Sequence, residues 1–152
     1  MRMQKSGLAV LVLLAFGAAS IGTASAQAAP GPRFGENLGF DLIVGGIGRD
    51  RITGSSGNDS LRGESGADRI AGGSGRDRVN GGSGNDSLRG DSGSDSITGG
   101  SGRDKISGGS GADRISAADG VRDRINCGSG RDRVTADRID RVARNCGRVR
   151  RS

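Results

Sequence analysis

The sequence predicts an all-β solenoid: a parallel β-roll, or β-helix, in which two nine-residue repeats form each coil. A unit of the form Gly-Gly-x-Gly-x-Asp-x-aliphatic-x recurs through most of the chain, most clearly over residues 72–80, 81–89 and 99–107. Each unit offers one aliphatic residue in a short strand-like stretch, and turn-forming Gly, Ser, Asn and Asp fill the rest. Because every unit repeats the same strand and turn, the chain is expected to wind in one sense.

Residues 1–26 have the organisation of a secretory signal peptide. Arg2 and Lys5 give a positive start, an apolar run follows over residues 8–19, and residues 24–26 are an Ala-Ser-Ala cleavage motif. A transmembrane anchor is the alternative, but the run is short for a bilayer and has no basic flank on its far side. The sequence therefore predicts a secreted, extracellular protein with no transmembrane segment after signal cleavage.

The repeat array covers residues 36–135, after a predicted linker at 27–35. The unit at 36–44 is degenerate, and a ten-residue unit at 117–126 slips the phase by one. The sixth positions that keep the nine-residue phase are Asp50, Asp59, Asp68, Asp77, Asp86, Asp95, Asp104 and Asp113. The eighth positions are Ile52, Leu61, Ile70, Val79, Leu88, Ile97, Ile106 and Ile115. Residues 136–152 leave the repeat, and we expect them to form a C-terminal cap and a frayed tail.

The arrangement of a coil follows from the alternation of side chains along a strand. Three residues around each aliphatic, such as 69–71, are expected to form a strand, with the aliphatic on one face and its neighbours on the other. Two units then make a coil of 18 residues, with strands in two facing sheets and the aliphatics between them. The turns stack in two columns, one on each side of the solenoid.

The stacked turns bring the sixth-position aspartates close together. One column is expected to contain Asp41, Asp59, Asp77, Asp95 and Asp113, and the other Asp50, Asp68, Asp86 and Asp104. At the strand spacing of about 4.8 Å, neighbouring carboxylates repel by roughly 3 kcal/mol at an effective dielectric near 20. Turn carbonyls point into the same space. Carboxylates with carbonyls are ligands for Ca²⁺, whereas the absence of histidine disfavours zinc, and magnesium tolerates such irregular geometry poorly.

The hydrophobic core is thin, because each unit contributes one aliphatic side chain and the chain contains 31 glycines. Burial of so few apolar groups does not offset the conformational entropy of ordering the array. We therefore expect folding to be coupled to the binding of several Ca²⁺ ions, with a disordered chain in their absence.

The two cysteines, Cys127 and Cys146, flank the end of the array. An even pair in a secreted chain predicts a disulfide, which would close a loop of about 20 residues and stabilise by roughly 3 kcal/mol on the chain-entropy model. Catalysis is not expected. The chain has no histidine or tyrosine, its cysteines are expected to be paired, and its carboxylates are already assigned to calcium. The protein is therefore predicted not to be an enzyme.

The repeats resemble the RTX, or haemolysin-type, calcium-binding nonapeptide family over residues 36–135. The resemblance implies a secreted bacterial protein that binds calcium between successive turns of a parallel β-roll, with the sixth-position aspartates as side-chain ligands and carbonyls around the glycines as the others. Asp41, Asp123 and Asp132 lie in degenerate or phase-shifted units and match less well. Ser55, Glu64 and Asp91 replace the second-position glycine, where polar residues could still allow the turn.

The basic character of the chain is not explained by the repeat. The net charge is +6, and arginine is frequent at the fifth and seventh positions. One interpretation is that the arginines face solvent and pair with nearby aspartates, with little effect on stability. The other is a cationic surface that binds an anionic extracellular or cell-wall polysaccharide in a calcium-dependent manner. Nucleic acid is not an expected partner, since only three phenylalanines supply aromatic surface, and one is in the signal peptide.

Overall fold

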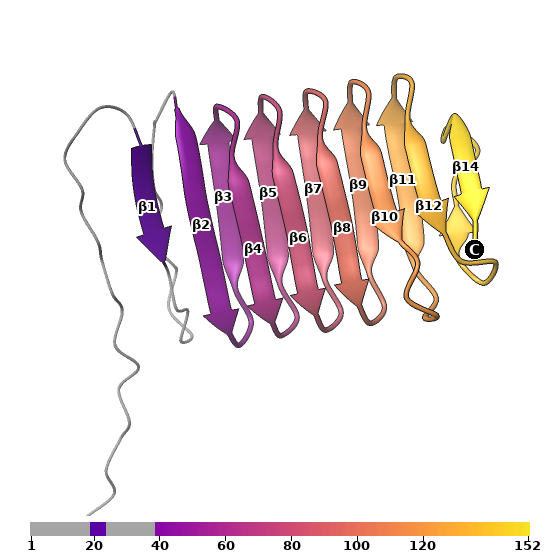
Figure 1. The fold of residues 1–152 in the computed structure, drawn as a ribbon, viewed down its shortest axis with the longest axis horizontal. Coiled ribbons are helices and arrows are strands. Elements are labelled where there is room, and N and C mark those ends of the chain that lie inside the picture. Colours follow the sequence, from indigo (N-terminus) through magenta and orange to yellow (C-terminus); the bar gives the residue numbers. More distant parts are fainter. Residues whose placement is uncertain (1–18, 24–38) are drawn as a thin grey trace, which may run out of the picture.

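The computed structural model describes residues 19–23 and 39–152, and these form a solenoid made only of strands and turns (Figure 1). Successive strands alternate between two sheets, and every pairing within a sheet is parallel. Partner residues in neighbouring coils of the regular array are 18 positions apart, as in the pair Ile52 and Ile70. The predicted all-β parallel roll with two repeats per coil is therefore confirmed.

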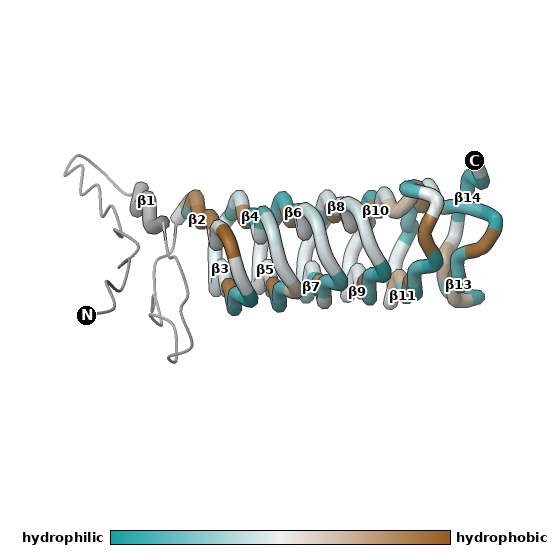
Figure 2. Tube along the Cα trace, turned by 90° about the horizontal axis from the view of Figure 1, so that it is seen from below, coloured by the Kyte–Doolittle hydropathy of each residue, from teal (hydrophilic) through white to brown (hydrophobic). Residues whose placement is uncertain are grey.

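The two sheets form the two layers of the solenoid (Figure 2). The first sheet consists, in spatial order, of β1 (Ala19–Thr23), β2 (Phe40–Ile47), β4 (Ser60–Ser65), β6 (Arg78–Ser83), β8 (Ser96–Ser101), β10 (Arg114–Ala117), β12 (Arg133–Ala136) and β14 (Arg148–Arg151). The second consists of β3 (Arg51–Ser56), β5 (Arg69–Ser74), β7 (Ser87–Ser92), β9 (Lys105–Ser110), β11 (Arg124–Ser129) and β13 (Arg141–Val142).

The eighth-position aliphatics form the core between the sheets. All eight that the repeat phase identifies are buried, with exposed fractions between 1% and 4%. They stack in register, so that Leu61 pairs with Val79 in the first sheet and Ile70 with Leu88 in the second. The position of the aliphatic within each unit therefore sets the register of the solenoid.

The strands are longer than the sequence analysis expects. A typical strand such as β6 covers six residues, from the seventh position of one unit to the third position of the next. The ladder pairing omits only the first-position glycine: Arg62 pairs with Asn80 and Glu64 with Gly82, while Gly63 is skipped. The expected strand of three residues was too short because glycines that can form turns also continue this ladder.

The second position of the unit has left-handed backbone whether or not it is glycine. Ser55, Glu64 and Asp91 have φ angles of 79°, 77° and 74°. Each pairs only with glycines in the coils next to it, as Glu64 does with Gly46 and Gly82. The polar replacements therefore keep the turn, and side chains at this position never stand in adjacent coils of the described array.

The fourth-position glycines stack directly on one another. Gly75 has φ 132°, and a Cβ built on it would overlap the carbonyl oxygen of Gly57 one coil earlier. The same overlap recurs for Gly66 against Gly48. Glycine is thus required here both by the backbone angle and by the close approach of two coils.

The N-terminal end of the described solenoid is β1, which pairs in parallel with β2. Ala19–Thr23 falls inside the predicted signal peptide, whose other residues, like the predicted linker at 27–35, lie outside the described residues. The signal peptide therefore stays a prediction. Within the described part of the chain, no helix is long and apolar enough to span a bilayer.

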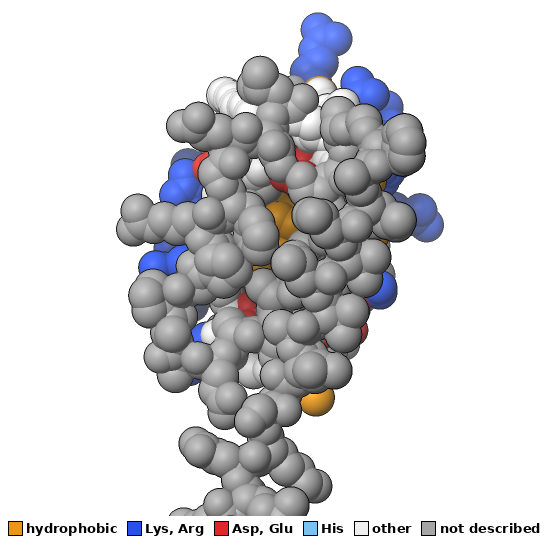
Figure 3. All heavy atoms as spheres, turned by 90° about the vertical axis from the view of Figure 1, so that its left-hand side faces the viewer, with side chains coloured by type: hydrophobic (Ala, Val, Ile, Leu, Met, Phe, Trp, Pro, Cys, Tyr) orange, Lys and Arg blue, Asp and Glu red, His pale blue; other side chains and the backbone are white. Residues whose placement is uncertain are grey.

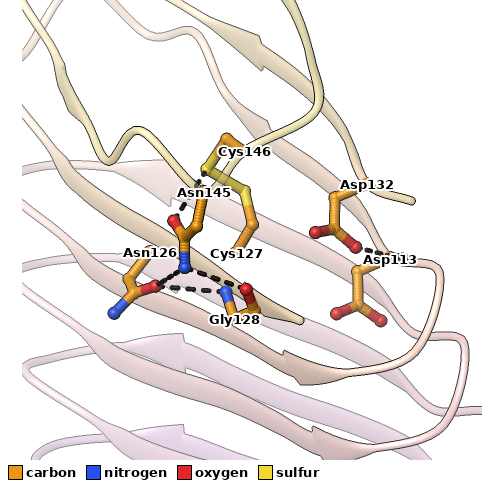
Figure 4. Close-up of a disulfide and its surroundings, with 7 residues drawn as sticks. All are labelled: Asp113, Asn126, Cys127, Gly128, Asp132, Asn145 and Cys146. Carbon is orange, nitrogen blue, oxygen red and sulfur yellow. Dashed lines mark hydrogen bonds between the residues drawn. A yellow bond between two sulfur atoms is a disulfide. The ribbon is translucent and has the colours of Figure 1, made fainter. Parts of the chain in front are cut away.

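The C-terminal cap is joined to the array by the disulfide between Cys127 and Cys146, which confirms the predicted pairing (Figure 4). Cys127 occupies a first position and is fully buried. The amide of Asn145 donates hydrogen bonds to Asn126 Oδ1 and to the carbonyl of Gly128, which holds the cap against β11.

The chain continues as a strand beyond this bridge. β14 (Arg148–Arg151) pairs with β12, so the expected frayed tail was wrong. All four of its residues are exposed, and its position depends on ladder hydrogen bonds rather than on burial. Backbone pairing leaves no pattern in the side chains, so the sequence of residues 148–151 did not indicate a strand.

We predict that Gly75→Ala destabilises the roll much more than Gly46→Ala. Both glycines have positive φ, but a Cβ on Gly46 would meet no atom of the described residues within 4 Å. The Gly46 variant should lose only the roughly 1–2 kcal/mol of a left-handed alanine, whereas Gly75→Ala must also separate two coils. Denaturant unfolding in excess calcium measures both, and equal losses would contradict the stacking argument.

Candidate metal centre

The sixth-position aspartates form two hydrogen-bonded columns along the solenoid. In each column the backbone N–H of one aspartate donates to Oδ1 of the aspartate one coil later, at 2.8–3.0 Å. The first column consists of Asp41, Asp59, Asp77, Asp95, Asp113 and Asp132. The second consists of Asp50, Asp68, Asp86, Asp104, Asp123 and Asp140.

These twelve carboxylates are buried, with exposed fractions of 0–7%. In most of them only Oδ1 has a hydrogen-bond donor. The second oxygen, Oδ2, is buried without a hydrogen bond in Asp59, Asp68, Asp77, Asp86, Asp95, Asp104, Asp113, Asp123 and Asp132. A buried carboxylate oxygen that lacks a donor is costly, so a cation beside it would be strongly favoured.

A backbone carbonyl faces the same space as the unsatisfied oxygen in six of these aspartates: Asp59, Asp68, Asp77, Asp86, Asp95 and Asp113. A Cβ built on Gly72 would lie 2.5 Å from Asp77 Oδ2 and 2.7 Å from the carbonyl oxygen of Gly90 in the next coil. First-position glycine therefore leaves room for a carboxylate from one unit and a carbonyl from the neighbouring coil to converge. Gly81, between Asp86 Oδ2 and the carbonyl of Gly99, repeats this arrangement in the second column.

The donor set consists only of oxygen atoms. No group of three or more His, Cys, Asp or Glu side chains that could hold a metal occurs among residues 39–152 or in β1. Side chains alone therefore do not complete a site, and backbone carbonyls have to supply the remaining ligands. This combination fits Ca²⁺, which takes six to eight oxygen ligands in flexible geometry.

The electrostatics of the columns also favours a cation. Burial raises the pKa of Asp59 and Asp95 to about 6 and that of Asp123 to about 7. The backbone N–H bond to each carboxylate lowers the pKa by a smaller amount, and neighbouring column carboxylates raise it again. The charged form of these groups is thus disfavoured unless positive charge lies close by.

The arginines do not neutralise the columns. The ion pairs within residues 39–152 are Arg62 with Glu64 at 3.1 Å and Arg89 with Asp91 at 2.7 Å, and neither involves a column aspartate. The arginines do face solvent, as one interpretation of the sequence expects, but the expected pairing with nearby aspartates occurs within this segment only between Arg89 and Asp91. Pairing of arginines with the column aspartates is absent there. The physical reason is the alternation along the chain, which directs the sixth position inward and the fifth and seventh outward.

Comparison with known protein families accounts for this geometry. The sequence model of the RTX calcium-binding nonapeptide repeat matches four stretches, residues 37–70, 53–88, 62–97 and 89–121, which together span more than half of the chain. The chain belongs to the RTX calcium-binding nonapeptide repeat family. Searches of curated proteins and of solved structures find no match.

Repeats of the RTX family bind Ca²⁺ between turns, and the several repeats of this chain imply several ions. The protein is thus a calcium-binding structural repeat protein, as the resemblance implies. The RTX β-roll is typically a structural calcium-binding module, which agrees with the expectation of a non-catalytic chain without excluding activity.

The columns extend beyond the regular phase of the RTX repeats. Asp123 and Asp132 follow their column neighbours by 19 residues, because the extra residue of the slipped unit is absorbed in a turn, and both rejoin the columns. Asp140 was missed by the sequence analysis, which placed residues 136–152 outside the repeat. The exposed fraction of Ile139 is 46%, and the usable signal was Asp140-Arg141-Val142, which repeats the Asp-Arg-aliphatic order of earlier units.

Asp140 ends its column without an unsatisfied oxygen. Its Oδ1 accepts the N–H of Asp123 and its Oδ2 accepts the N–H of Asp137. The cap therefore supplies a backbone N–H donor to Oδ2, the carboxylate oxygen that has no donor in most of the earlier column aspartates.

We predict that acidification stabilises the calcium-free roll. The roll binds more protons than the unfolded chain between the ordinary aspartate pKa of 3.8 and the raised values of about 6–7. Its stability should therefore rise as pH falls through 7 and 6, and reach its full value below pH 3.8. Circular dichroism in chelator between pH 8 and 4 measures this.

Asp95→Asn is the matched variant, since it removes one of the groups with a raised pKa while the amide oxygen can still accept the backbone N–H of Asp77. Its response to acid should be shallower than that of the parent chain. A parent roll that loses structure between pH 7 and 5 would contradict the argument.

Proposed function

We propose that this is a secreted protein whose repeat array folds on binding Ca²⁺ and then has a structural or binding role. The ligands we assign are the column aspartates Asp50, Asp59, Asp68, Asp77, Asp86, Asp95, Asp104 and Asp113, together with Asp41, Asp123 and Asp132 from the degenerate or phase-shifted units. The observation that carries the assignment is the buried carboxylate oxygen that faces a glycine carbonyl of the next coil, as at Asp77 and Gly90.

Coupled folding follows from the cost of burying like charges. Each carboxylate is desolvated, and the next one in its column is one strand spacing away, about 4.8 Å. A divalent cation between coils compensates two such groups at once, and its binding free energy becomes folding free energy. Extracellular calcium-binding modules typically bind in the 10⁻⁴–10⁻³ M range, which suits a chain that is exported unfolded.

We predict that Asp77→Asn raises the calcium concentration needed for folding by about tenfold, equivalent to about 1.4 kcal/mol. The amide oxygen can still accept the N–H of Asp59, so the change removes charge while it preserves the hydrogen bond. Asp91→Asn is the control, because Asp91 lies outside the columns and pairs with exposed Arg89.

Calcium titration by circular dichroism gives the two midpoints, and calorimetry gives the number of ions bound. Equal midpoints for both variants would contradict the ligand assignment. A parent chain with the same folded signal in excess chelator as in millimolar calcium would contradict coupled folding.

Secretion rests on the signal-like residues 1–26, and we predict that the exported chain begins at Gln27. Expression in a bacterial host with the native N-terminus, followed by mass spectrometry of the medium, measures the mature terminus. Ala26→Leu removes the small residue before the cleavage point and should leave the chain unprocessed. An intact N-terminus on the exported parent chain would contradict cleavage.

A second candidate function is a calcium-dependent cationic surface for anionic extracellular or cell-wall polymers. It is favoured by the separation of charge in the fold. All 20 Lys and Arg residues of the segment 39–152 are exposed, whereas 12 of its 16 acidic residues are the buried column aspartates. In the end view, blue basic side chains project beyond the outline at the top and on both sides (Figure 3).

The four other acidic residues do little to offset this surface. Glu64 and Asp91 are paired with Arg62 and Arg89. Of the other two, Asp119 accepts the backbone N–H of Gly102, and Asp137 accepts those of Asp119 and Gly120. Calcium in the columns would therefore leave an almost wholly positive exterior.

A further inference from the structure

A groove of about 730 Å³ lies beside the first aspartate column, between the start of β6 and the start of β12. Five arginines line it: Arg76, Arg78, Arg114, Arg131 and Arg133. None of the five forms an ion pair with an acidic residue of the segment 39–152. The groove is therefore a place where several unpaired basic side chains surround a hollow.

The hollow results from small residues in the middle of two arginine-rich ladders. At the seventh position, Arg78, Ser96, Arg114 and Arg133 stand opposite one another in consecutive strands of the first sheet. At the fifth position, the residues in the same four coils are Arg76, Ser94, Ala112 and Arg131. Serine and alanine leave space, and two arginine pairs close the groove at its ends.

The floor of the groove adds a dependence on calcium. Asp77, Asp95 and Asp113 contribute to its lining and belong to the first column. Without a cation these carboxylates would repel an anion, and with Ca²⁺ beside them the repulsion is removed. Calcium in the first column is therefore expected to raise the affinity of the groove for an anion.

We propose that this groove is a calcium-dependent binding site for an acidic oligosaccharide that carries carboxylates, such as a short oligouronate. The arginine pairs at its ends are three strand steps apart, about 14 Å, so the site suits a chain with several spaced charges rather than a single anion. Guanidinium groups bind carboxylates through two parallel hydrogen bonds. The hydroxyl of Ser96 is available to sugar hydroxyls, and Ser94 accepts the N–H of Ala112 at 3.4 Å.

Carbohydrate is favoured over nucleic acid by what lines the groove. No aromatic side chain is among its lining residues, so bases would find no stacking surface. The groove instead combines guanidinium groups with small polar residues. A single-stranded nucleic acid would be held here only through its phosphates. Comparison of an oligonucleotide with an oligouronate of equal charge distinguishes the two ligand classes.

The inference rests on the proposed calcium-dependent roll, and the experiment separates the two. Binding of tetragalacturonate to the protein in millimolar calcium is measured by calorimetry, with circular dichroism of the same sample to report the fold. Neutral galactotetraose and a thymidine oligonucleotide of equal charge serve as comparison ligands. Titration of tetragalacturonate into calcium buffer alone corrects for binding of calcium by the sugar.

The double variant Arg78→Ser/Arg133→Ser tests the groove, because Ser96 shows that the first sheet accepts serine at this position. Its control is Arg51→Ser/Arg69→Ser, which makes the same charge change at the seventh position of the second sheet, where Ser87 is found. We expect the groove variant to bind tetragalacturonate about tenfold or more weakly, and the control to change affinity less than about twofold.

Each other outcome has one meaning. Equal losses in the two double variants would show a diffuse cationic surface and overturn the groove. Oligonucleotide binding as tight as that of tetragalacturonate, with the same loss in the groove variant, would overturn the carbohydrate assignment. A folded roll that binds no acidic ligand would overturn the site and leave the calcium function intact, whereas a chain that does not fold in calcium would overturn both.

Discussion

The structure depends on a carboxylate that each turn buries with only one of its oxygens satisfied by the protein. The N–H of the previous coil reaches Oδ1, which fixes the vertical spacing of the columns, and Oδ2 is left facing a glycine carbonyl. A side chain at the first position would fill that space, and one at the fourth would collide with the coil beside it. The glycines of the repeat are therefore consequences of the buried aspartate and of the close stacking it requires.

The alternation of inward and outward positions along each unit buries the acidic side chains and exposes the basic ones. Inward positions of each unit hold the aspartate and the aliphatic, and outward positions hold arginine, serine or asparagine. A chain whose overall charge is modest thus becomes an acidic interior within a basic shell. Calcium ions bound at the columns would then favour the binding of anions at the surface, because they neutralise the negative field of the column carboxylates.

The sequence predicted the features that follow from phase, and it failed where phase is interrupted. Spacing by nine assigned Asp59 and Asp68 to opposite columns and the aliphatics to the core. The slip after residue 116 hid Asp140, whose partner Asp123 is 17 residues earlier, because a turn can absorb residues without moving a ladder. β14 could not be anticipated, since its four residues are exposed and it pairs with β12 through the backbone. The groove could not be predicted without the register of four coils. Only that register shows that Ser94, Ser96 and Ala112 lie between arginines of the neighbouring coils.

The glycine neighbours of Ser55, Glu64 and Asp91 bear on how such a chain can change in length. Near-identical repeats invite the loss of a unit during replication, and such a loss moves every later unit to the opposite sheet. Loss of residues 72–80 would place Asp91 in the coil directly after Glu64, with two acidic side chains and two left-handed backbones in contact where each now has glycine beside it. The solenoid is therefore constrained to pair each polar second-position residue with glycines. We expect its length to change during evolution by whole coils of two units rather than by single nonapeptides.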